Sequence, residues 1–392
     1  MDYSGQNPQG ASSQRKKAAP SGASATSARI SEVPAAGKLR LVQNTLNLME
    51  PPAPVAWEWT CALEALAQAY KLAVQIGAPG QVTARREAEH QADQCLPVFA
   101  PWENVSIANL GAEHAFRFSP QPIWAASYLY DCGVDRPAAQ RCVDIMLMSP
   151  HPDACVMDDN CVDSDGGAAL PQTGAISAMV NAAREEGRAR LAIIVPSRCC
   201  NAMKRCLVAA DDEITEGELA IEVLAIEDAI GLFLGDPLGW DAIIATPELR
   251  GIVLAILAQT TGVAGPWPIL WHDSGLRLVG SETLADQAGP LPLDATLLLH
   301  SLALVARRTG LGYEASRLHE SWARLRDQGV TTHHHDNAFP YLNQVSESDF
   351  IALACAEPDS HTRPLPAWKA LDTCHRNNAP DPAVQLKLVA SS

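Results

Sequence analysis

The sequence predicts an α/β protein built as two lobes around a shared core. From about Asn47 onward, short apolar runs alternate with segments of helical periodicity, which is typical of a sheet covered by helices. A length of 392 residues exceeds that of one small domain. A hydrophobic content of 47% supplies enough apolar residues for a sizeable core.

The clearest αβ unit is the stretch PQTGAISAMVNAAREEGRARLAIIVPS. A helix is predicted from Gly174, because Ile176, Met179, Val180 and Ala183 recur at helical spacing. A Gly/Arg-rich turn and the buried strand LAIIVPS follow this helix. Further strands are predicted at EVLAIED and WDAIIATP, and further helices at TLLLHSLALVARR and SRLHESWARLRDQGV.

The two ends of the chain differ in composition from the middle. Residues 1–45 are rich in Ser, Ala, Gly, Gln and Pro, a composition that cannot bury a core and predicts a disordered tail. Residues 357–392 turn Pro-rich and polar, and we interpret them as a C-terminal extension.

Charge and hydropathy exclude several classes of partner. The formal net charge of -16 does not favour the basic face that nucleic acid binding needs. No run of about 18 apolar residues is free of charge and proline, so we expect no direct membrane insertion. The first residues lack the apolar core of a secretory signal, so we expect an intracellular protein, cytoplasmic or in the mitochondrial matrix, with its 11 cysteines reduced.

Several segments occur in the order of a known family. YLYDCGVDRP is similar to D-L-Y-A-N-V-R-P. The stretch from Glu227 to Gly251 is similar to V-D-N-A-A-M-Q-L-V-x-N-P-x-x-F-D-V-I-V-T-P-N-L-Y-G, with Pro237, Asp241, Thr246, Pro247 and Gly251 in the same order. GLRLVGSETLADQAGP is similar to F-E-P-V-H-G-S-A-P-D-I-A-G-K-G. Together these segments cover most of residues 47–352 and resemble the isocitrate/isopropylmalate dehydrogenase family of β-decarboxylating dehydrogenases.

The resemblance implies an isopropylmalate dehydrogenase-like two-lobed fold with a mixed central sheet. Residues 46–130 and 271–356 would form the large, cofactor-type lobe. Residues 131–270 would form the small, dimerisation-type lobe.

The resemblance also implies that the catalytic positions are not intact. In the family, three Asp residues hold Mg or Mn through oxygen ligands, and a Lys transfers a proton. The Asp positions fall on Glu227, Ile252 and Ile256, and isoleucine cannot coordinate a cation. The Lys position falls on Cys199, or on Arg198 if the register slips by one residue, and Arg stays protonated near neutral pH. We therefore expect no metal site here.

The substrate and cofactor positions are only partly kept. Of the family's Arg residues that bind the substrate carboxylates, Arg136 is the one that can be placed. The cofactor loop keeps the G-S and D-x-A-G parts of the family's pattern with a different spacing between them, and further along the chain Asp stands in place of the family's Asn. These cofactor-type residues are Gly280, Ser281, Asp286, Ala288, Gly289 and Asp294. Val279 stands where the family has the His that contacts adenine, so we expect no bound NAD. Because the metal-ligand positions are also lost, we expect no bound Mg or Mn.

A chain with the family's fold but without its catalytic residues favours the hypothesis of a non-catalytic subunit with a structural or regulatory role. Its partner would be a dehydrogenase paralogue in a hetero-oligomer, or a larger complex. A dimer is expected. We expect new partner contacts first near Trp57, Trp59 and Trp102.

Two alternatives stay open at this point. One is a divergent, active NAD-dependent decarboxylating dehydrogenase of isocitrate or 3-isopropylmalate type that needs Mg/Mn, supported by Glu227, Asp241 and the cofactor loop. The other is a transition-metal binder that uses His333, His334, His335 and Asp336. Consecutive loop residues rarely converge on one ion, so an exposed polar loop is the favoured interpretation of that cluster.

Overall fold

A computed structural model describes much of the chain, and all described residues belong to one compact unit, residues 43–392. The described ranges are 45–49, 51, 55–77, 97–105, 124–134, 142–157, 169–210, 218–273, 275–284, 289–332, 341–356 and 364–372. Several predictions fall outside these ranges: the tail up to residue 44, Arg136, Asp286, Ala288, the His333–His335 cluster and Asp336. The division into two lobes stays a prediction.

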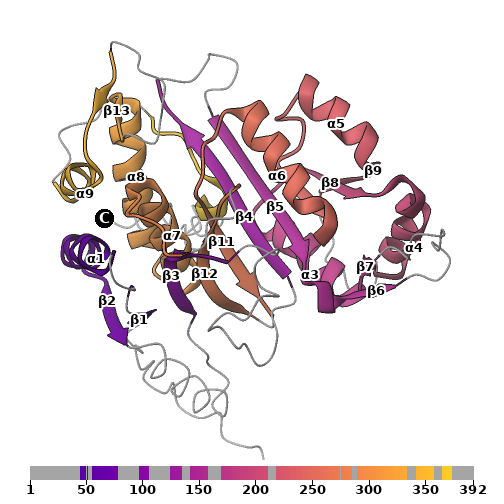
Figure 1. The fold of residues 1–392 in the computed structure, drawn as a ribbon, viewed down its shortest axis with the longest axis horizontal. Helices are drawn as coiled ribbons and strands as arrows, with labels where there is room; N and C mark the ends of the chain where they lie inside the picture. The colour runs from indigo at the N-terminus through magenta and orange to yellow at the C-terminus, as the bar shows by residue number, and fades with distance from the viewer. Residues whose placement is uncertain are drawn as a thin grey trace, which may run out of the picture. The chain divides into compact units, whose positions relative to one another are not determined.

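Ten of the described strands form one mixed sheet in the order β2-β1-β3-β12-β11-β4-β5-β10-β8-β9 (Figure 1). The first four of these strands are parallel to one another: β2 (Ala73–Gly77), β1 (Thr45–Met49), β3 (Val98–Asn104) and β12 (Leu276–Glu282). The last four are also mutually parallel: β5 (Cys142–Pro150), β10 (Ala242–Ala245), β8 (Arg190–Val195) and β9 (Ala220–Ala225). This arrangement confirms the predicted α/β class with a mixed central sheet.

Two antiparallel strands join the parallel blocks. These are β11 (Trp267–His272) and β4 (Trp124–Cys132), and each is antiparallel to both of its neighbours. β4 is buried along its whole length and pairs with β5 from Trp124 opposite Pro150 to Cys132 opposite Cys142. In the order of the ten strands, β11 and β4 are the central two.

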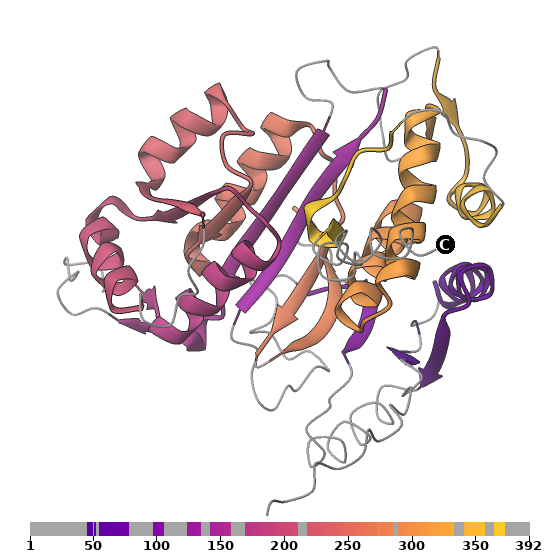
Figure 2. The same ribbon diagram turned by 180° about the vertical axis from the view of Figure 1, so that it is seen from behind.

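Alternate residues of β4 and β5 face opposite sides of the sheet, as the pleat of a strand requires. Tyr128 and Met146 belong to one hydrophobic cluster, and Leu129 and Ile145 belong to a second. Figure 1 shows α6 in front of β5, and Figure 2 shows α3 on the other side. The helices that contribute to the first cluster are α1 (Ala56–Tyr70), α3 (Thr173–Glu185), α4 (Cys200–Ala210), α7 (Ala295–Arg308), α8 (Gly312–Asp327) and α9 (Glu347–Cys355). Those of the second cluster are α5 (Ile226–Gly235) and α6 (Pro247–Thr261).

Two short sheets complete the described strands: β6 (Cys155–Met157) with β7 (Ala169–Pro171), and β13 (Val330–Thr331) with β14 (Asn343–Gln344). No helix within the described ranges is long and apolar enough to cross a membrane.

The elements predicted from local patterns are confirmed. The helix predicted from Gly174 is α3, and the later helices are α7 and α8. The strands predicted at LAIIVPS and WDAIIATP are β8 and β10. The strand predicted at EVLAIED is β9, which ends earlier, at Ala225, because Glu227 and Asp228 already form the first turn of α5. Acidic residues there suit the positive end of the helix dipole.

The expectation that Trp59 and Trp102 provide a contact surface is wrong. Both side chains are fully buried, and their rings meet edge to face with centroids 5.6 Å apart. Trp59 also donates a hydrogen bond from Nε1 to the Leu291 carbonyl at 3.0 Å. They are core residues, whereas Trp57 is exposed.

Residues 364–372, which the sequence places in the C-terminal extension, pack into the core. Trp368 is 1% exposed, and Ala370 and Leu371 are also buried. We call residues 364–372 the C-terminal strap.

Candidate functional site

A buried ion pair joins the two segments that the resemblance assigns to metal and cofactor. Arg250 lies in the first turn of α6, two residues before Ile252, and Glu282 is the last residue of β12, directly after Ser281. Both charged side chains are buried. The guanidinium donates two hydrogen bonds to the carboxylate, from Nε to Oε1 at 2.9 Å and from Nη2 to Oε2 at 2.7 Å.

Neighbouring strands satisfy the remaining atoms of this pair. Arg250 donates from Nη2 to the Ser127 hydroxyl at 2.6 Å, and from Nη1 to the Ser149 hydroxyl at 3.1 Å and the Leu147 carbonyl at 3.3 Å. Ser127 in turn donates to Glu282 Oε2 at 2.5 Å. The pair thus links α6 and β12 to β4 and β5.

An Arg fork recognises a carboxylate with two parallel hydrogen bonds. In this chain the Arg250 fork already holds an internal carboxylate, that of Glu282, so the guanidinium needs no acidic substrate to satisfy it. The arrangement is closed and charge-balanced, and it offers neither a free base nor an open cation site.

The three positions that correspond to the family's metal ligands provide one carboxylate. Glu227 is exposed at the start of α5, where its Oε1 accepts a hydrogen bond from the Ser197 hydroxyl at 3.5 Å. Ile252 is 50% exposed, and Ile256, one turn further along α6, packs partly against the core. Within the ranges that the structure describes, no group of three His, Cys, Asp or Glu residues could hold a metal ion. These residues do not fit Mg or Mn, which prefer several oxygen ligands.

The position assigned to the catalytic Lys is not accessible. Cys199 ends a 3-10 turn (Ser197–Cys199) before α4, and its side chain is 0% exposed. Arg198, the residue for the shifted register, is exposed instead. A buried thiol without contact to solvent is badly placed to exchange a proton with a substrate.

The described cofactor-type residues have structural roles in this chain. A Cβ atom at Gly280 would lie 2.1 Å from Val105 Cγ2, so close packing of Val105 explains the glycine. Ser281 donates to the Glu103 carbonyl at 2.9 Å. Asp294 caps α7 by accepting a hydrogen bond from the Leu297 N–H at 2.7 Å.

Gly289 has a φ of +108°, a backbone conformation that favours glycine. The cofactor-like pattern is therefore accounted for, at each described position, by packing, capping or backbone geometry.

A second charged network lies on the other side of β4 and β5. Arg188 binds Asp144 Oδ1 at 2.6 Å and Glu186 Oε2 at 3.0 Å. Glu186 Oε1 accepts from Arg308 at 2.9 Å and from the Tyr128 hydroxyl at 2.7 Å. Burial raises the pKa of Asp144 although Arg188 opposes the shift, and burial also raises the pKa of Tyr128. Two cations balance two carboxylates here, so the network supports the core.

The C-terminal strap anchors itself to this network. The Lys369 N–H donates to Asp144 Oδ2 at 2.9 Å, and its ammonium group contacts Asp241 Oδ2. Asp241 also accepts hydrogen bonds from the N–H groups of Ala189 and Arg190, each at 2.9 Å. Burial alone would raise the pKa of Asp241, but the hydrogen bonds from Lys369 and the backbone lower it. Asp241, one support for the enzyme alternative, is therefore a structural anchor.

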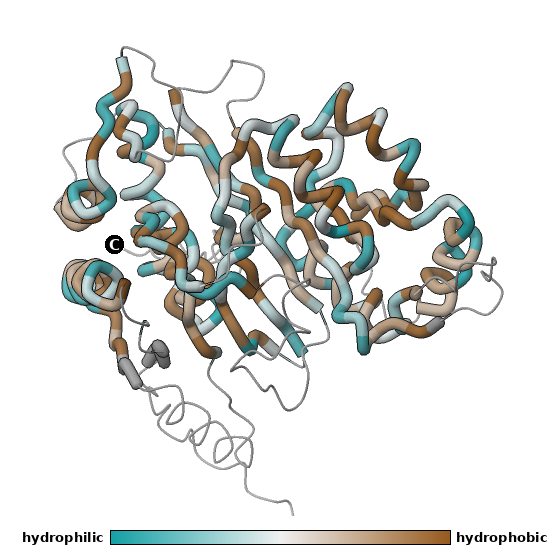
Figure 3. The backbone as a smooth tube through the Cα atoms, viewed as in Figure 1, coloured by the Kyte–Doolittle hydropathy of each residue, from teal (hydrophilic) through white to brown (hydrophobic). Residues whose placement is uncertain are grey.

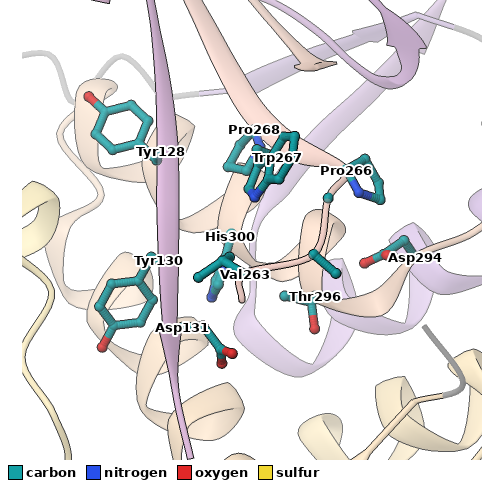
Figure 4. A pocket seen from close by; sticks show the side chains of 12 residues that line it. Tyr128, Tyr130, Asp131, Val263, Pro266, Trp267, Pro268, Asp294, Thr296 and His300 are labelled. Atoms are coloured by element: carbon teal, nitrogen blue, oxygen red, sulfur yellow. The ribbon is translucent and has the colours of Figure 1, made fainter. Parts of the chain in front are cut away.

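A small pocket lies between β4, the start of β11 and the start of α7. Figure 4 shows Tyr130, Asp131, Thr296 and His300 around it. Nε2 of His300 and Nε1 of Trp267 are buried without a hydrogen-bond partner. The cavity volume of about 20 Å³ has room for one or two water molecules. It is too small for a nucleotide.

Sequence reasoning missed Arg250, Glu282 and Trp368. The available signal was a single Arg among the apolar residues of α6 and a Glu at the end of an apolar strand. A lone charge in an apolar segment is informative, because buried charges are almost always paired.

Comparisons with known proteins identify the fold. No family model matches the chain, and no curated protein matches it. Among solved structures, the chain is similar to the TT0538 protein from Thermus thermophilus, with a TM-score of 0.56, 14% identity, and coverage of 79% of this chain and 67% of that one. It is also similar to isocitrate dehydrogenase from Methylococcus capsulatus, with a TM-score of 0.53, 10% identity, and coverage of 79% and 98%. At these identities the likeness shows the fold alone.

Proposed function

The chain has the isocitrate dehydrogenase fold, and we propose that it is a non-catalytic subunit with a structural or regulatory role in a protein assembly. The partner is a dehydrogenase paralogue, a second copy or a larger complex.

The Arg250–Glu282 pair carries this proposal. It occupies the junction between the segments that would hold metal and cofactor in a working enzyme. The Ser127 and Ser149 hydroxyls and the Leu147 carbonyl, from β4 and β5, hydrogen-bond to the pair and enclose it. Burying two charges costs several kcal/mol per ion, which their mutual attraction offsets only when the geometry is good. Such a pair fixes the junction in one arrangement.

The metal and proton-transfer positions support the same proposal. Ile252 and Ile256 cannot coordinate a cation, and Cys199 is buried. The single carboxylate of Glu227 is a poor substitute for a set of oxygen ligands.

An exposed apolar surface supports the role of a subunit. Leu232 and Leu234 on α5 are 45% and 66% exposed, and Ile252 on the neighbouring helix α6 is 50% exposed. Figure 3 shows hydrophobic stretches along both helices. We call Leu232, Leu234 and Ile252 the α5–α6 apolar surface. Exposed apolar side chains on two helices that pack together are candidate contacts for a partner protein.

Affinity isolation of the tagged full chain from its own cells tests this proposal. We expect a protein to co-purify at fixed stoichiometry, identified by mass spectrometry. The Leu234→Glu variant should lose that protein, because the new charge would be desolvated in an apolar contact. Tyr313→Glu is the matched control: Tyr313 is 70% exposed on α8, and a carboxylate there suits the first turn of a helix.

Retention of the partner by Leu234→Glu, with normal folding by circular dichroism, would remove the α5–α6 apolar surface from the proposal. Recovery of the chain alone would contradict the subunit role, unless size measurement shows a dimer that Leu234→Glu dissociates. The competing proposal, an active NAD-dependent dehydrogenase that needs Mg/Mn, is separated from this one by a turnover assay.

A further inference from the structure

Two cysteines face each other at the end of the central strand pair. Cys132 is the last residue of β4, Cys142 is the first of β5, and the register of the antiparallel pair places them directly opposite one another. Residues opposite each other in such a pair project from the same face. Neither cysteine takes part in a disulfide.

Directly opposite residues in antiparallel strands have Cα atoms about 4.5 or 5.5 Å apart, depending on the hydrogen-bonding position. A disulfide needs a Cα separation of about 4.4–6.8 Å. Both Cα separations fall inside this range, so the spacing of β4 and β5 suits a disulfide between the two cysteines.

We propose that Cys132 and Cys142 form a reversible redox modification site, a cross-strand dithiol that low-molecular-weight disulfides oxidise to a disulfide between β4 and β5. The pair is distinct from the candidate site described above and does not depend on the proposed function.

The surroundings of the two thiols determine the order of reaction. Cys142 is exposed, whereas Cys132 is 2% exposed and lies 3.9 Å from the Tyr130 hydroxyl. Burial, followed by the nearby Asp131 carboxylate, raises the pKa of the Cys132 thiol to about 12. The thiolate is the attacking species in disulfide exchange, so Cys142 reacts first and Cys132 second.

With glutathione disulfide as the oxidant, the chemistry is balanced. The Cys142 thiolate attacks one sulfur of the oxidant, forms a mixed disulfide and releases one glutathione thiolate. Cys132 then loses its proton, attacks the Cys142 sulfur and displaces the second glutathione. The protein loses two electrons and two protons, and one disulfide is reduced to two thiols.

Peptide mapping under non-reducing conditions tests the proposal on the reduced full chain treated with glutathione disulfide. Trypsin cleaves after Arg141, between the two cysteines, so the disulfide would join two separate peptides. We expect this linked species in the wild type and in Cys155→Ser, a control in the same tryptic peptide as Cys142. Cys142→Ser should lose it.

The Cys132→Ala variant tests the order of the two steps. Without the second thiol, the mixed disulfide with glutathione should accumulate on Cys142 instead of being resolved. Cys132→Ser serves the same purpose if the alanine variant does not fold. The proposal is overturned if the folded wild type keeps both thiols, keeps glutathione on Cys142, or links Cys142 to another cysteine.

Discussion

Arg250 and Glu282, 32 residues apart in the chain, form a buried two-point ion pair at the junction of α6 and β12. Ser127 bridges the two side chains, accepting from Arg250 and donating to Glu282. The pair connects the segments that the resemblance assigns to metal binding and to cofactor binding. In this chain the Arg250–Glu282 pair therefore connects α6 to β12 where the resemblance places a catalytic site.

Breaking this pair should be more damaging than replacing it. Arg250→Met leaves the Glu282 carboxylate buried without its cation, and we expect a loss of roughly 3–5 kcal/mol in the free energy of unfolding. The double variant Arg250→Met with Glu282→Leu should recover most of that loss. Urea unfolding followed by circular dichroism measures both. A single variant within about 1 kcal/mol of the wild type would contradict a buried, unsolvated pair.

The glycine of the cofactor-like segment should prove to be a packing residue. Gly280→Ala places a Cβ against the rigid Val105 side chain, and we expect a destabilisation of about 1–3 kcal/mol. Gly251→Ala is the matched control in α6, because no heavy atom lies within 4 Å of its added Cβ and alanine favours a helix by up to about 1 kcal/mol. Equal thermal midpoints for the two variants would contradict the steric explanation.

The C-terminal strap should contribute strongly to stability through one side chain. Trp368 stacks on Tyr130 with ring centroids 4.8 Å apart and also contacts His300 and His319. Trp368→Ala removes this packing, with an expected cost of about 3–5 kcal/mol. Lys369→Met, which removes a partly exposed ion pair with Asp241, should cost less than about 1 kcal/mol. The denaturant midpoints of the two variants compare these costs. A Trp368→Ala variant that is destabilised no more than Lys369→Met would mean that the strap is not part of the core.

Stability should fall as the pH is lowered from about 6.5 to about 4, partly because of His319. Burial lowers the pKa of His319 to about 4, and burial also lowers the pKa of its neighbour His300. Between the usual and the lowered pKa, the unfolded chain binds more protons than the folded one, so acid favours unfolding. His319 accounts for roughly 3 kcal/mol of this loss.

The comparison with His319→Gln isolates this contribution, because the carboxylates titrate equally in both proteins. The variant should show a flatter dependence of unfolding free energy on pH in this window. Parallel curves for wild type and variant would show that His319 is protonated equally in the folded and unfolded chains.

Local patterns predicted much of the fold. The periodicity of α3 and the β-branched run of β8 depend on neighbours a few residues apart, so both elements could be found in the sequence. The family resemblance then supplied the mixed sheet, which no local pattern contains.

Contacts between distant residues could not be predicted in the same way. Arg250 has its partners on three separate strands, and Trp368 lies in a Pro-rich stretch whose composition favours an exposed segment. Trp59 and Trp102 were misplaced for the same reason, since their burial depends on each other and on Leu291. The resemblance directed attention to α6 and β12 but not to Arg250 and Glu282, which join them.

The central proposal, a dehydrogenase fold without its reaction, is tested most directly by measuring turnover of the purified full chain. The assay combines isocitrate or 3-isopropylmalate with NAD and either Mg²⁺ or Mn²⁺, and follows the reduced nicotinamide by absorbance. We predict no signal above the blank for the wild type. Turnover that disappears in Glu227→Gln, the variant of the one carboxylate left among the metal-type positions, would contradict the proposal and establish an active enzyme.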